Sequence, residues 1–395
     1  MTTPYFTIII PTRNRSQFIL DTVLSAASQD FEDFEVIVSD NSSDDKTREV
    51  LAACRQGKEV RYIKPPTELS MPDHWEFATL QARGKYVLVL TDRSVLRQGA
   101  LGTIYRLMAN CGMETVHVCS WSWALFDDEQ ETLISGAGDL GNATGSLVAS
   151  PDVASMFVGP QKEYPYSLPR ALNSCYSAEI AASIRARHGK LFLPINPDFT
   201  SAFLLLGYVD NLLYIDTPLF ISRGLLQSNG GNAYKTDGTA YMRSLNIADW
   251  YGHVPIKAAF IESMIFEDFL MVKEMAGGTL LKVEMDWVEY FVRCHNELQE
   301  KKRVNVLDRS QIGVLQDEWN GALKSMDDDI RYKVGDRLRK SRLSRAKDTL
   351  RSMPFMGVIR KLRASIKPAQ QNVIARLPTT VLEAAGHKAR YEGKL

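Results

Sequence analysis

The sequence is poor in cysteine, has no long apolar run and carries no net charge. Its 5 cysteines among 395 residues are scattered, with no Cys-x-x-Cys pair, which favours reduced thiols over a disulfide framework or a zinc site. No apolar stretch is long enough to span a bilayer, and the first residues, MTTPYFTIII, lack the basic segment of a secretory signal. We therefore expect a cytoplasmic protein, either free in solution or peripheral on the inner face of the cytoplasmic membrane.

Motifs of two further protein classes are also missing. The sequence has no P-loop, which argues against an NTPase. Its 6 histidines are dispersed, and no Ser/His/Asp set has motif-level support. The sequence therefore supports neither NTP hydrolysis nor triad chemistry.

His74, in MPDHWE, is expected on a helix surface, and Trp75 beside it in the core.

The zero net charge hides an asymmetry along the chain. Residues 331–395 hold 17 Lys and Arg against 4 Asp and Glu, whereas residues 1–330 hold 30 against 43. Such a division suggests an acidic body with a basic tail for an anionic partner.

Strands alternate with helices over the first 125 residues. Continuous apolar, β-branched runs indicate strands that are covered on both faces, and the segments between them place apolar residues at helical spacing. Together they predict βαβ units and a parallel sheet. Later on, residues 176–188 indicate a helix, residues 212–221 a strand pair broken at Pro218, and the chain beyond about 255 mainly helices. The early strands are expected at 5–10, 34–38, 60–63, 85–90 and 115–122, and the early helices at 16–29, 72–82 and 97–110.

Polar clusters follow three of these strands at the point where each ends. They read PTRN after the first strand, SDNSSD after the second and TDRS after the fourth. Ligands of open α/β sheets bind beyond the carboxyl ends of the strands. The three clusters are therefore expected to line one crevice.

These clusters carry a resemblance to a known family. FTIIIPTRNR, FEVIVSDNSSDD and SMPDHWEFATLQARGKYVLVLTDRSVL resemble the family 2 glycosyltransferases of GT-A fold, and PDFTSAFLLLGYVDNLLYIDTPLFIS is similar to the acceptor half of bacterial surface-polysaccharide members. The likeness is good over about 5–125 and moderate to about 230. It implies an α/β, Rossmann-like, mostly parallel sheet flanked by helices, with a mainly helical C-terminal region.

The resemblance and the composition together give an expected domain organisation. Residues 1–240 form the GT-A domain, with the nucleotide-sugar-binding half at 1–125 and the acceptor half at 126–240. Residues 241–330 form a helical extension, and residues 331–395 a basic amphipathic helical tail.

The first two clusters are expected to bind the nucleotide of a nucleotide-sugar donor. Asp40 is placed at a strand end, where its carboxylate can accept the ring N–H of a base. Residues of the second cluster also suit turns and helix caps, and Ser42 or Ser43 can cap the helix that follows. The nucleotide-sugar-binding residues predicted here are Pro11, Thr12, Arg13, Asn14, Asp40, Asn41 and Ser43, joined by Asp92 and Arg93 from the third cluster.

The third cluster departs from the family pattern. The family places two or three acids where this chain has Asp92, Arg93 and Ser94, so the last, metal-ligating acid is a serine. A diphosphate leaving group needs a divalent cation or fixed positive groups, and Mg²⁺ or Mn²⁺ prefers carboxylate oxygens. Asp92 with Ser94 is the expected metal site. The alternatives are that Arg93 replaces part of the metal's charge, which weakens the metal dependence, or that the site is degenerate.

Inverting transfer also needs a base that takes the proton of the acceptor hydroxyl. By resemblance this is Asp198, which follows Pro197 and precedes an apolar helical run; its alternative role is that of an acid in the first turn of a helix. Asp210 is the inferior alternative for the base, because it lies among apolar residues without a motif. Glu267 and Asp268, in IFEDFL, are expected on an exposed helix face.

The basic tail has apolar residues at helical spacing among its arginines and lysines over 340–385. A basic amphipathic helix can lie on an anionic membrane surface, which suits a lipid-linked acceptor. Packing on the acidic body or in a homo-oligomer is the alternative, and nucleic acid is not expected because no recognised binding module is present. The apolar residues are Phe355, Val358, Ile359, Leu362, Ile366, Val373, Ile374, Leu377, Val381 and Leu382.

The sequence thus predicts an inverting glycosyltransferase. It would move a sugar from a nucleotide-diphosphate sugar, most commonly a UDP-sugar in this family, to a glycan or lipid-linked glycan of a surface polysaccharide. The alternative is a catalytically degenerate GT-A module that binds a nucleotide or glycan in an assembly complex, because of the serine at position 94.

Overall fold

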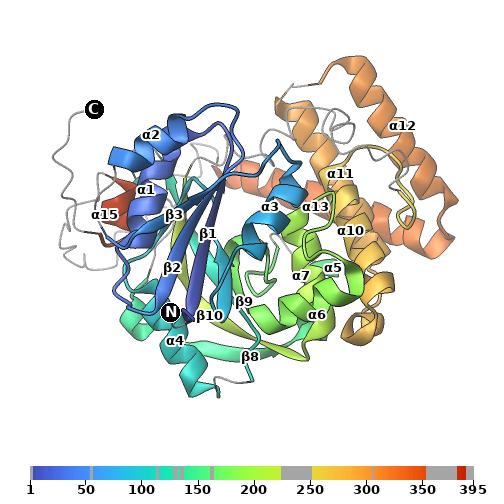
Figure 1. Cartoon of the computed structure of the whole chain (residues 1–395). Helices are drawn as coiled ribbons and strands as arrows, with labels where there is room; N and C mark the ends of the chain where they lie inside the picture. Colours follow the sequence, from blue (N-terminus) through green and yellow to red (C-terminus); the bar gives the residue numbers. More distant parts are fainter. Residues whose placement is uncertain are drawn as a thin grey trace, which may run out of the picture.

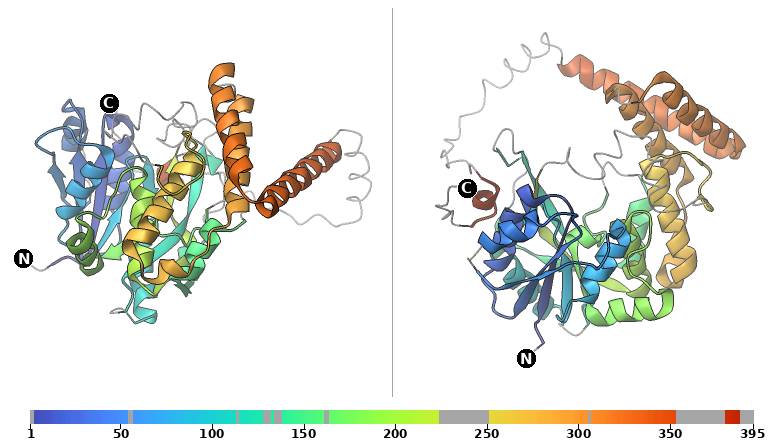
Figure 2. Two further views of the ribbon diagram at one scale, coloured as in Figure 1. Left: turned by 90° about the vertical axis from the view of Figure 1, so that its right-hand side faces the viewer. Right: turned by 45° about the horizontal axis from the view of Figure 1, so that its top comes forward.

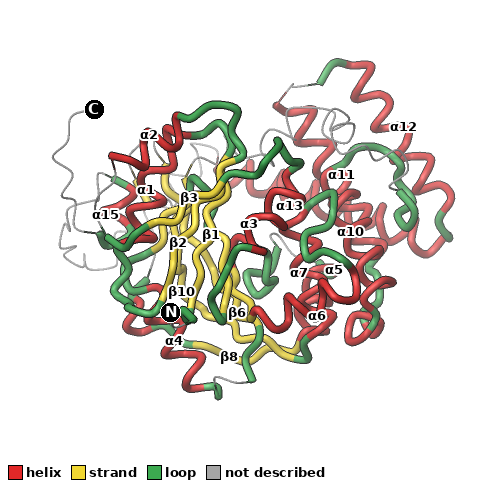
Figure 3. Tube along the Cα trace, viewed as in Figure 1, coloured by secondary structure: helices red, strands yellow, loops and turns green. Residues whose placement is uncertain are grey.

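The computed structural model describes residues 3–53, 57–112, 115–127, 132–133, 138–160, 164–223, 251–304, 307–352 and 380–387. At its centre is one mixed sheet with the strand order β3-β2-β1-β4-β9-β6-β10-β5, to which β7 and β8 attach at β6 and β10 (Figures 1 and 3). The strands are β1 (Phe6–Thr12), β2 (Phe34–Asp40), β3 (Val60–Ile63), β4 (Tyr86–Val89), β5 (Ser94–Leu96), β6 (Val118–Asp127), β7 (Thr132–Leu133), β8 (Gly145–Ala149), β9 (Ser174–Ser177) and β10 (Asn211–Arg223).

The first four strands of this order are parallel, as expected. β1 pairs with β2 on one side and with β4 on the other, and β3 extends the sheet beyond β2. Because parallel strands end at the same edge, this pairing brings Thr12 opposite Asp40, with the turn that contains Asp92 beyond the end of β4. The register therefore gathers the three polar clusters at one edge of the sheet.

Both faces of these strands are covered. All seven residues of β1 are buried. Ile8 and Ile10 pack with α1 and α4, whereas Ile9 packs on the opposite face with α3 and with α7 (Pro197–Tyr208). Alternation of side chains across a strand explains why the run FTIII is apolar without interruption. Figure 1 shows the helices on the two sides of the sheet. The helices of the first half are α1 (Ser16–Ala27), α2 (Lys46–Ala53), α3 (Met71–Leu80) and α4 (Ala100–Asn110).

The middle of the sheet differs from the expected strand sequence. The strand expected at 115–122 is β6, which continues to Asp127 and does not neighbour β4. Instead β9 lies between them and pairs antiparallel with both. A short strand, β5, precedes α4, so the helix expected from residue 97 begins at Ala100.

The strand pair expected at 212–221 is one strand, β10. It pairs in parallel with β6 along its length, and the register shifts between Ile215 and Phe220, the stretch that contains Pro218. Proline has no N–H for the ladder, and a local irregularity accommodates it without ending the strand. The prediction of two strands was therefore wrong.

Helices of the second half cover the face of the sheet on which Ile9 lies. α10 packs on α7, and α11 packs on α10, α12 and α13. The expected fold class is confirmed: an α/β, mostly parallel sheet flanked by helices, with a mainly helical C-terminal region (Figure 2). These elements are α5 (Ser150–Val158), α6 (Ala178–His188), α7 (Pro197–Tyr208), α10 (Ile261–Ala276), α11 (Trp287–Val304), α12 (Arg309–Ser325), α13 (Asp328–Ser352) and α15 (Val381–Ala384), with short 3-10 turns at Leu140–Asn142, Ala171–Asn173 (η2) and Gly278–Lys282.

Two segments bear on the expected tail. The boundary expected at 330/331 falls inside α13, where Val334 is fully buried against the body. At the other end, α15 lies beside α1, on the far side of the sheet from α12 (Figure 1). Most of the predicted apolar stripe, from Phe355 to Leu377, and the boundary at 240/241 lie outside the described residues. Among the helices of the described ranges, none has the length and apolarity to cross a bilayer.

Candidate active site

The exits of β1 and β4 are joined by a buried contact between Thr12 and Asp92. The Thr12 hydroxyl donates to Asp92 Oδ2 at 2.9 Å, and Arg15 Nη1 lies 3.4 Å from Asp92 Oδ1. Asp92 is only 4% exposed, and its burial raises the pKa of the carboxyl, opposed by the positive charge of Arg15 and the bond from Thr12. The carboxylate therefore lies at a desolvated site where two protein groups favour its charged form.

The two neighbours of Asp92 in the third cluster have different environments. Arg93 is held by a bond from Nη1 to the carbonyl of Arg223 at 2.9 Å, and burial lowers the pKa of its guanidinium. The Ser94 hydroxyl is buried and shares a hydrogen bond of 2.7 Å with Thr91. Asp92 thus has two arginines near its carboxylate, and Ser94 faces Thr91.

Asp40, at the end of β2, is held by hydrogen bonds to both of its carboxylate oxygens. Asp40 is fully buried; its Oδ1 accepts from the backbone N–H of Ser42, and its Oδ2 accepts from the Tyr62 hydroxyl, each at 2.9 Å. Desolvation and then the neighbouring carboxylate raise the pKa of Tyr62 to about 12, so Tyr62 stays a neutral donor. Each carboxylate oxygen has a second lone pair, which leaves Asp40 able to accept one more N–H.

Asn14 and Asn41 shape the loops around this exit. Asn14 adopts a positive φ of 54°, and its N–H donates to Ser42 Oγ at 2.7 Å. The Asn41 side chain donates to the Leu69 carbonyl at 2.8 Å and accepts from the Leu69 N–H at 3.0 Å. Through these two hydrogen bonds, the Asn41 side chain connects the end of β2 to the loop before α3.

The remaining predicted donor residues lie at the periphery of this edge. Pro11 is buried in β1 opposite Ser39, and Arg13 is exposed and paired with Glu68. Ser43 is exposed, and α2 begins only at Lys46, whose N–H binds Asp44 Oδ1. The expectation that Ser42 or Ser43 caps this helix was wrong, because the turn is longer than the sequence suggested.

His74 is not on a helix surface, as we had expected. It is 4% exposed, and its Nε2 lies 2.9 Å from Ser39 Oγ in β2. Burial lowers the pKa of His74 to about 4, so the ring is neutral. Trp75 packs in the core against Phe192, as predicted. The error has a simple cause: α3 lies across the sheet and buries its middle turn.

The residues around Asp92 provide few ligands for a divalent cation. The described part of the chain contains no group of three His, Cys, Asp or Glu side chains that could hold a metal ion. Hard cations take six or more oxygen ligands, whereas here one carboxylate faces Thr12 and Arg15. Protein groups alone therefore do not form a cation cage here, and an ion at Asp92 would also need oxygens of a bound diphosphate. The expected Mg²⁺ or Mn²⁺ remains a prediction.

The predicted base, Asp198, lies in the first turn of α7. Burial raises the pKa of its carboxyl, and the charge of Arg170 opposes that shift. Arg170 comes from the segment before η2, and its guanidinium lies over the rings of Trp123, at 4.6 Å, and Phe199, at 5.3 Å. The acid at 198 thus has a positive partner from a different element.

Glu267 and Asp268 were expected on an exposed face and are both buried. Asp268 Oδ2 accepts from the backbone N–H of Asn196 at 3.2 Å and from its side chain at 2.7 Å, just before α7. Glu267 accepts from the N–H groups of Gly252 and His253. The prediction failed because α10 is covered on one side by α7 and on the other by α11, so its acids serve as anchors for loops.

Four residues that were not predicted for the site contact or orient the predicted site residues or the segments that carry them. Arg15 follows the first cluster directly and could have been found as a positive charge at a strand exit. Tyr62, Arg170 and Asp268 could not, because their partners are distant in sequence: 22 residues separate Tyr62 from Asp40, and 72 separate Asp268 from Asn196.

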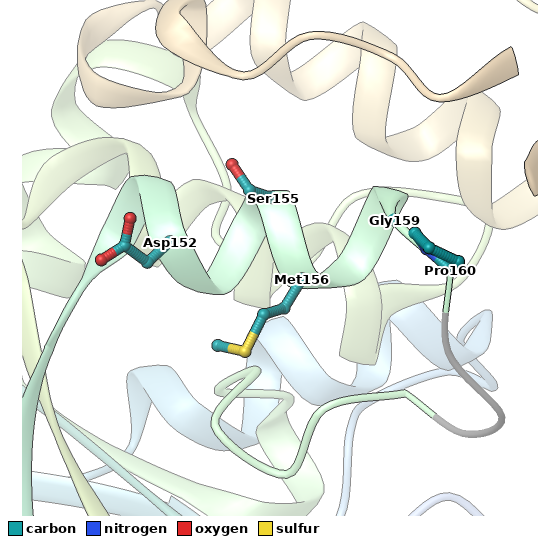
Figure 4. Close-up of a pocket in the computed structure, with 5 residues that line it drawn as sticks. All are labelled: Asp152, Ser155, Met156, Gly159 and Pro160. Carbon is teal, nitrogen blue, oxygen red and sulfur yellow. The ribbon is translucent and has the colours of Figure 1, made fainter.

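A surface hollow of about 450 Å³ lies away from these strand exits. It is lined by Asp152, Ser155, Met156, Gly159 and Pro160 along α5 and the turn after it (Figure 4). With one carboxylate and no opposing charged group, this lining offers no chemistry that matches the polar clusters, so the strand exits remain the candidate active site.

Residues 7–124 match the model of the family described as Glycosyl transferase family 2. A GalNAc(5)-diNAcBac-PP-undecaprenol beta-1,3-glucosyltransferase of Campylobacter jejuni is 33% identical over 103 residues, which are 26% of this chain. The matching part spans about a third of that relative's length, 33%. The family-model match covers the part of the chain that carries the three clusters.

Among solved structures, residues 1–349 of S. aureus TarS in complex with UDP-GlcNAc align with a TM-score of 0.45 and 17% identity, over 85% of this chain and 92% of that one. The mannosyltransferase PcManGT from Pyrobaculum calidifontis, in complex with GDP-Man and Mn²⁺, aligns with a TM-score of 0.42 and 14% identity, over 85% and 84%.

Proposed function

Because residues 7–124 match the model of glycosyl transferase family 2, we propose that the protein is an inverting, nucleotide-sugar-dependent glycosyltransferase. The observation that carries the proposal is the convergence of Thr12, Asp40 and Asp92 at one edge of the sheet, with Arg15 and Arg93 beside Asp92. Carboxylates at strand exits with adjacent arginines suit a nucleotide at one end and a diphosphate at the other.

In this proposal the donor is held by its base and by its diphosphate. Asp40, oriented by Tyr62 and Ser42, accepts the ring N–H of the base. Pro11 to Asn14, with Asn41 and Ser43, border the base and ribose. Arg15 and Arg93 provide the positive charge that stabilises the leaving diphosphate, since groups fixed in advance require no reorganisation during the reaction.

A divalent cation would add to this charge. Asp92, with Ser94 as a weaker second ligand, would hold Mg²⁺ or Mn²⁺ with oxygens of the bound diphosphate, and the ion would neutralise charge on the leaving group. Because two arginines lie near Asp92 and few cation ligands do, we propose that the arginines provide most of the positive charge on the diphosphate. Activity would then depend only weakly on a metal ion.

Asp198 is proposed as the base. It lies at the start of α7 in the acceptor half, and it keeps a positive neighbour, Arg170, that favours its ionised form. The acceptor is proposed to be a glycan or lipid-linked glycan of surface-polysaccharide synthesis. Its support is the name of the C. jejuni relative, which includes an undecaprenol-linked glycan.

We place the enzyme at the inner face of the cytoplasmic membrane, where basic residues of the segment 340–385 would contact anionic lipids. Val381 and Leu382, the last apolar residues of that segment, pack against the body instead. Liposome pelleting of the intact protein and of a variant without 340–395 tests this. Equal pelleting of both proteins, or none of the intact protein, would remove the idea and favour packing on the body or on a second copy.

The function is tested by calorimetric titration of UDP, GDP and dTDP, with Mg²⁺ or Mn²⁺ and again with EDTA. We expect one nucleotide to bind, with EDTA weakening its affinity only a few-fold. Release of that nucleotide from its sugar donors is then followed with and without candidate glycans. Failure of all three nucleotides to bind would contradict the proposal.

A second candidate is a module that binds a nucleotide or glycan without transfer. It is favoured by Ser94, whose hydroxyl faces Thr91 where the family places an acid. Binding of a nucleotide with neither transfer nor slow donor hydrolysis would support it. Ser94→Asp separates the cases, because a gain of both metal affinity and activity would indicate a weakened catalytic site.

A further inference from the structure

Arg170 is a half-buried arginine whose side-chain N–H groups have no acceptor among the described residues. Within the described ranges it forms no hydrogen bond or ion pair through its side chain, and its Nε is buried without a partner. Its guanidinium instead lies over the faces of Trp123 and Phe199. An arginine stacked in this way keeps its donor edge available for a planar or oxygen-rich ligand.

The backbone around Arg170 is tightly held. Asn173 donates from its side chain to the carbonyls of Trp121, Tyr166 and Leu168, and Ser174 Oγ donates to the Arg170 carbonyl at 2.7 Å. The absence of a partner is therefore not the result of a loose segment. The protein fixes the guanidinium and leaves its N–H edge unpaired.

The unpaired edge belongs to a residue that acts on Asp198. Phe199, under the guanidinium, follows Asp198 directly in α7, and Asp198 is the carboxylate that attracts Arg170. The two side chains do not form an ion pair within 4.0 Å, although both belong to the described residues.

We propose that Arg170 is an acceptor-binding residue, which donates N–H groups to oxygens of the acceptor sugar while Asp198 faces the hydroxyl that reacts. This rests on the proposed transfer. In that step the acceptor O–H bond breaks and its proton passes to Asp198, the acceptor oxygen bonds to the anomeric carbon, and the bond from that carbon to the diphosphate breaks with its electron pair on the diphosphate.

The charge of Arg170 also sets the pH range in which Asp198 can act. Arg170 lowers the pKa of Asp198, which burial raises. The other acid that faces this pair is Asp268 from α10, and Tyr164 and Tyr166 lie near the guanidinium. Without the positive charge, Asp198 would need a higher pH to lose its proton, so the acidic limb of the rate profile would move upward.

The test compares Arg170→Gln and Arg170→Lys with the control Arg187→Gln, an exposed arginine of α6. The readout is the pH profile of UDP or GDP release from UDP-glucose, UDP-GlcNAc or GDP-mannose, measured with water and again with glucose, GlcNAc or mannose as the acceptor sugar. We expect Arg170→Gln to shift the acidic limb to higher pH by half a unit or more, and to reduce kcat at pH 7 by tenfold or more. Arg170→Lys should leave the acidic limb of the pH profile in place and should reduce kcat at pH 7 by a smaller factor.

Calorimetric binding of the nucleotide should be unchanged in Arg170→Gln, because Arg170 lies outside the donor-binding half. Profiles and rates identical to the wild type would overturn the role of Arg170 and leave the proposed function standing. If the wild-type protein bound no nucleotide and released none, the proposed function would fail instead.

A double-mutant cycle tests the pair without any substrate. The melting temperatures of Arg170→Gln, Asp198→Asn and the double variant should be non-additive at pH 8, where two attracting charges are both present. Additive changes would mean that the two side chains do not interact, which also overturns the assignment. A melting temperature of Arg170→Gln close to that of the wild type shows that a kinetic change does not come from unfolding.

Discussion

The hydroxyl of Thr12 donates a 2.9 Å hydrogen bond to Asp92 Oδ2, which ties the exit of β1 to the turn after β4 across 80 residues of sequence. With Arg15 on the other carboxylate oxygen, this contact orients Asp92 before any ligand arrives. Preorganised charge of this kind is the largest single contribution to the rate enhancement of many enzymes. The position of Asp92 therefore leads to the first prediction.

Asp92→Asn should reduce donor turnover by roughly 100-fold or more, because the variant keeps the shape and loses the charge. Its melting temperature should equal or exceed that of the wild type, since the substitution removes a desolvated carboxylate. Asp44→Asn, at the exposed part of the second cluster, is the matched control. Unchanged turnover of Asp92→Asn would contradict the role of the carboxylate.

Tyr62→Phe should weaken nucleotide binding by about tenfold. A hydrogen bond to a charged group contributes about 1.5–3 kcal/mol, and the Tyr62 hydroxyl orients Asp40 through such a bond. Asp40→Ala should abolish binding, and Tyr105→Phe, on α4, should have no effect. Titration calorimetry with the nucleotide that binds the wild type gives the three affinities; equal affinities for Tyr62→Phe and the wild type would argue against Asp40 as the base reader.

Asp268 should make the protein less stable as the pH rises. Burial raises the pKa of its carboxyl from 3.8 to about 8, so between these values the folded state binds a proton that the unfolded state has lost. The free energy of unfolding therefore falls as pH rises from about 4 to about 8. Urea unfolding of the wild type and Asp268→Asn should show the variant gaining relative stability across this window, whatever its offset from the lost loop contacts. A constant difference between the two proteins would refute the assignment.

Residues 380–387, near the C-terminus, pack against β5, the strand that follows Asp92, and we call this segment the clasp. Val381 and Ala385 are buried with Val95, Phe126 and Ile221. Backbone and ring contacts complete the docking: Gln98 N–H donates to the Ala385 carbonyl, and His387 Nε2 lies 2.7 Å from the Leu96 carbonyl.

Removal of residues 380–395 should lower the melting temperature by several degrees and weaken donor binding, because it exposes this apolar cluster behind β5. Val381→Asp should act in the same way, whereas Glu383→Gln should have little effect. Thermal melting and calorimetry of the three proteins decide this, and a truncated protein as stable as the full chain would show that the clasp contributes nothing.

Burial lowers the pKa of His387, so the unfolded state binds a proton more readily than the folded state. The stability that the clasp provides should be complete above about pH 6.5 and decrease as the pH falls below it. His387→Ala should remove this sensitivity to acid. Melting curves between pH 5 and 8 measure it.

The sequence led to correct conclusions where local pattern and covalent order decide the structure. The uninterrupted run before Thr12 predicted a strand buried on both faces, and Ile8 and Ile9 do face two different cores. Strands in βαβ order end at one edge, which explains why Thr12, Asp40 and Asp92 could be brought together from sequence alone.

The errors arose where contacts between distant elements decide the outcome. His74, Glu267 and Asp268 have polar side chains on helices, and the local pattern favours solvent for such residues. Each is buried because another element covers that turn of its helix and provides hydrogen-bond partners. The insertion of β9 between β4 and β6 likewise depends on a pairing that no local signal reveals.

The amino-acid sequence by itself determined the order of strands and helices in the first half, apart from the short strand β5, and the polar residues at the strand ends, because side-chain periodicity and strand direction are properties of the chain. Only the tertiary structure decided which distant groups support those residues: Tyr62 on Asp40, and Arg170 near Asp198. A supporting group needs only the right position and charge in space, and many stretches of sequence can deliver it there.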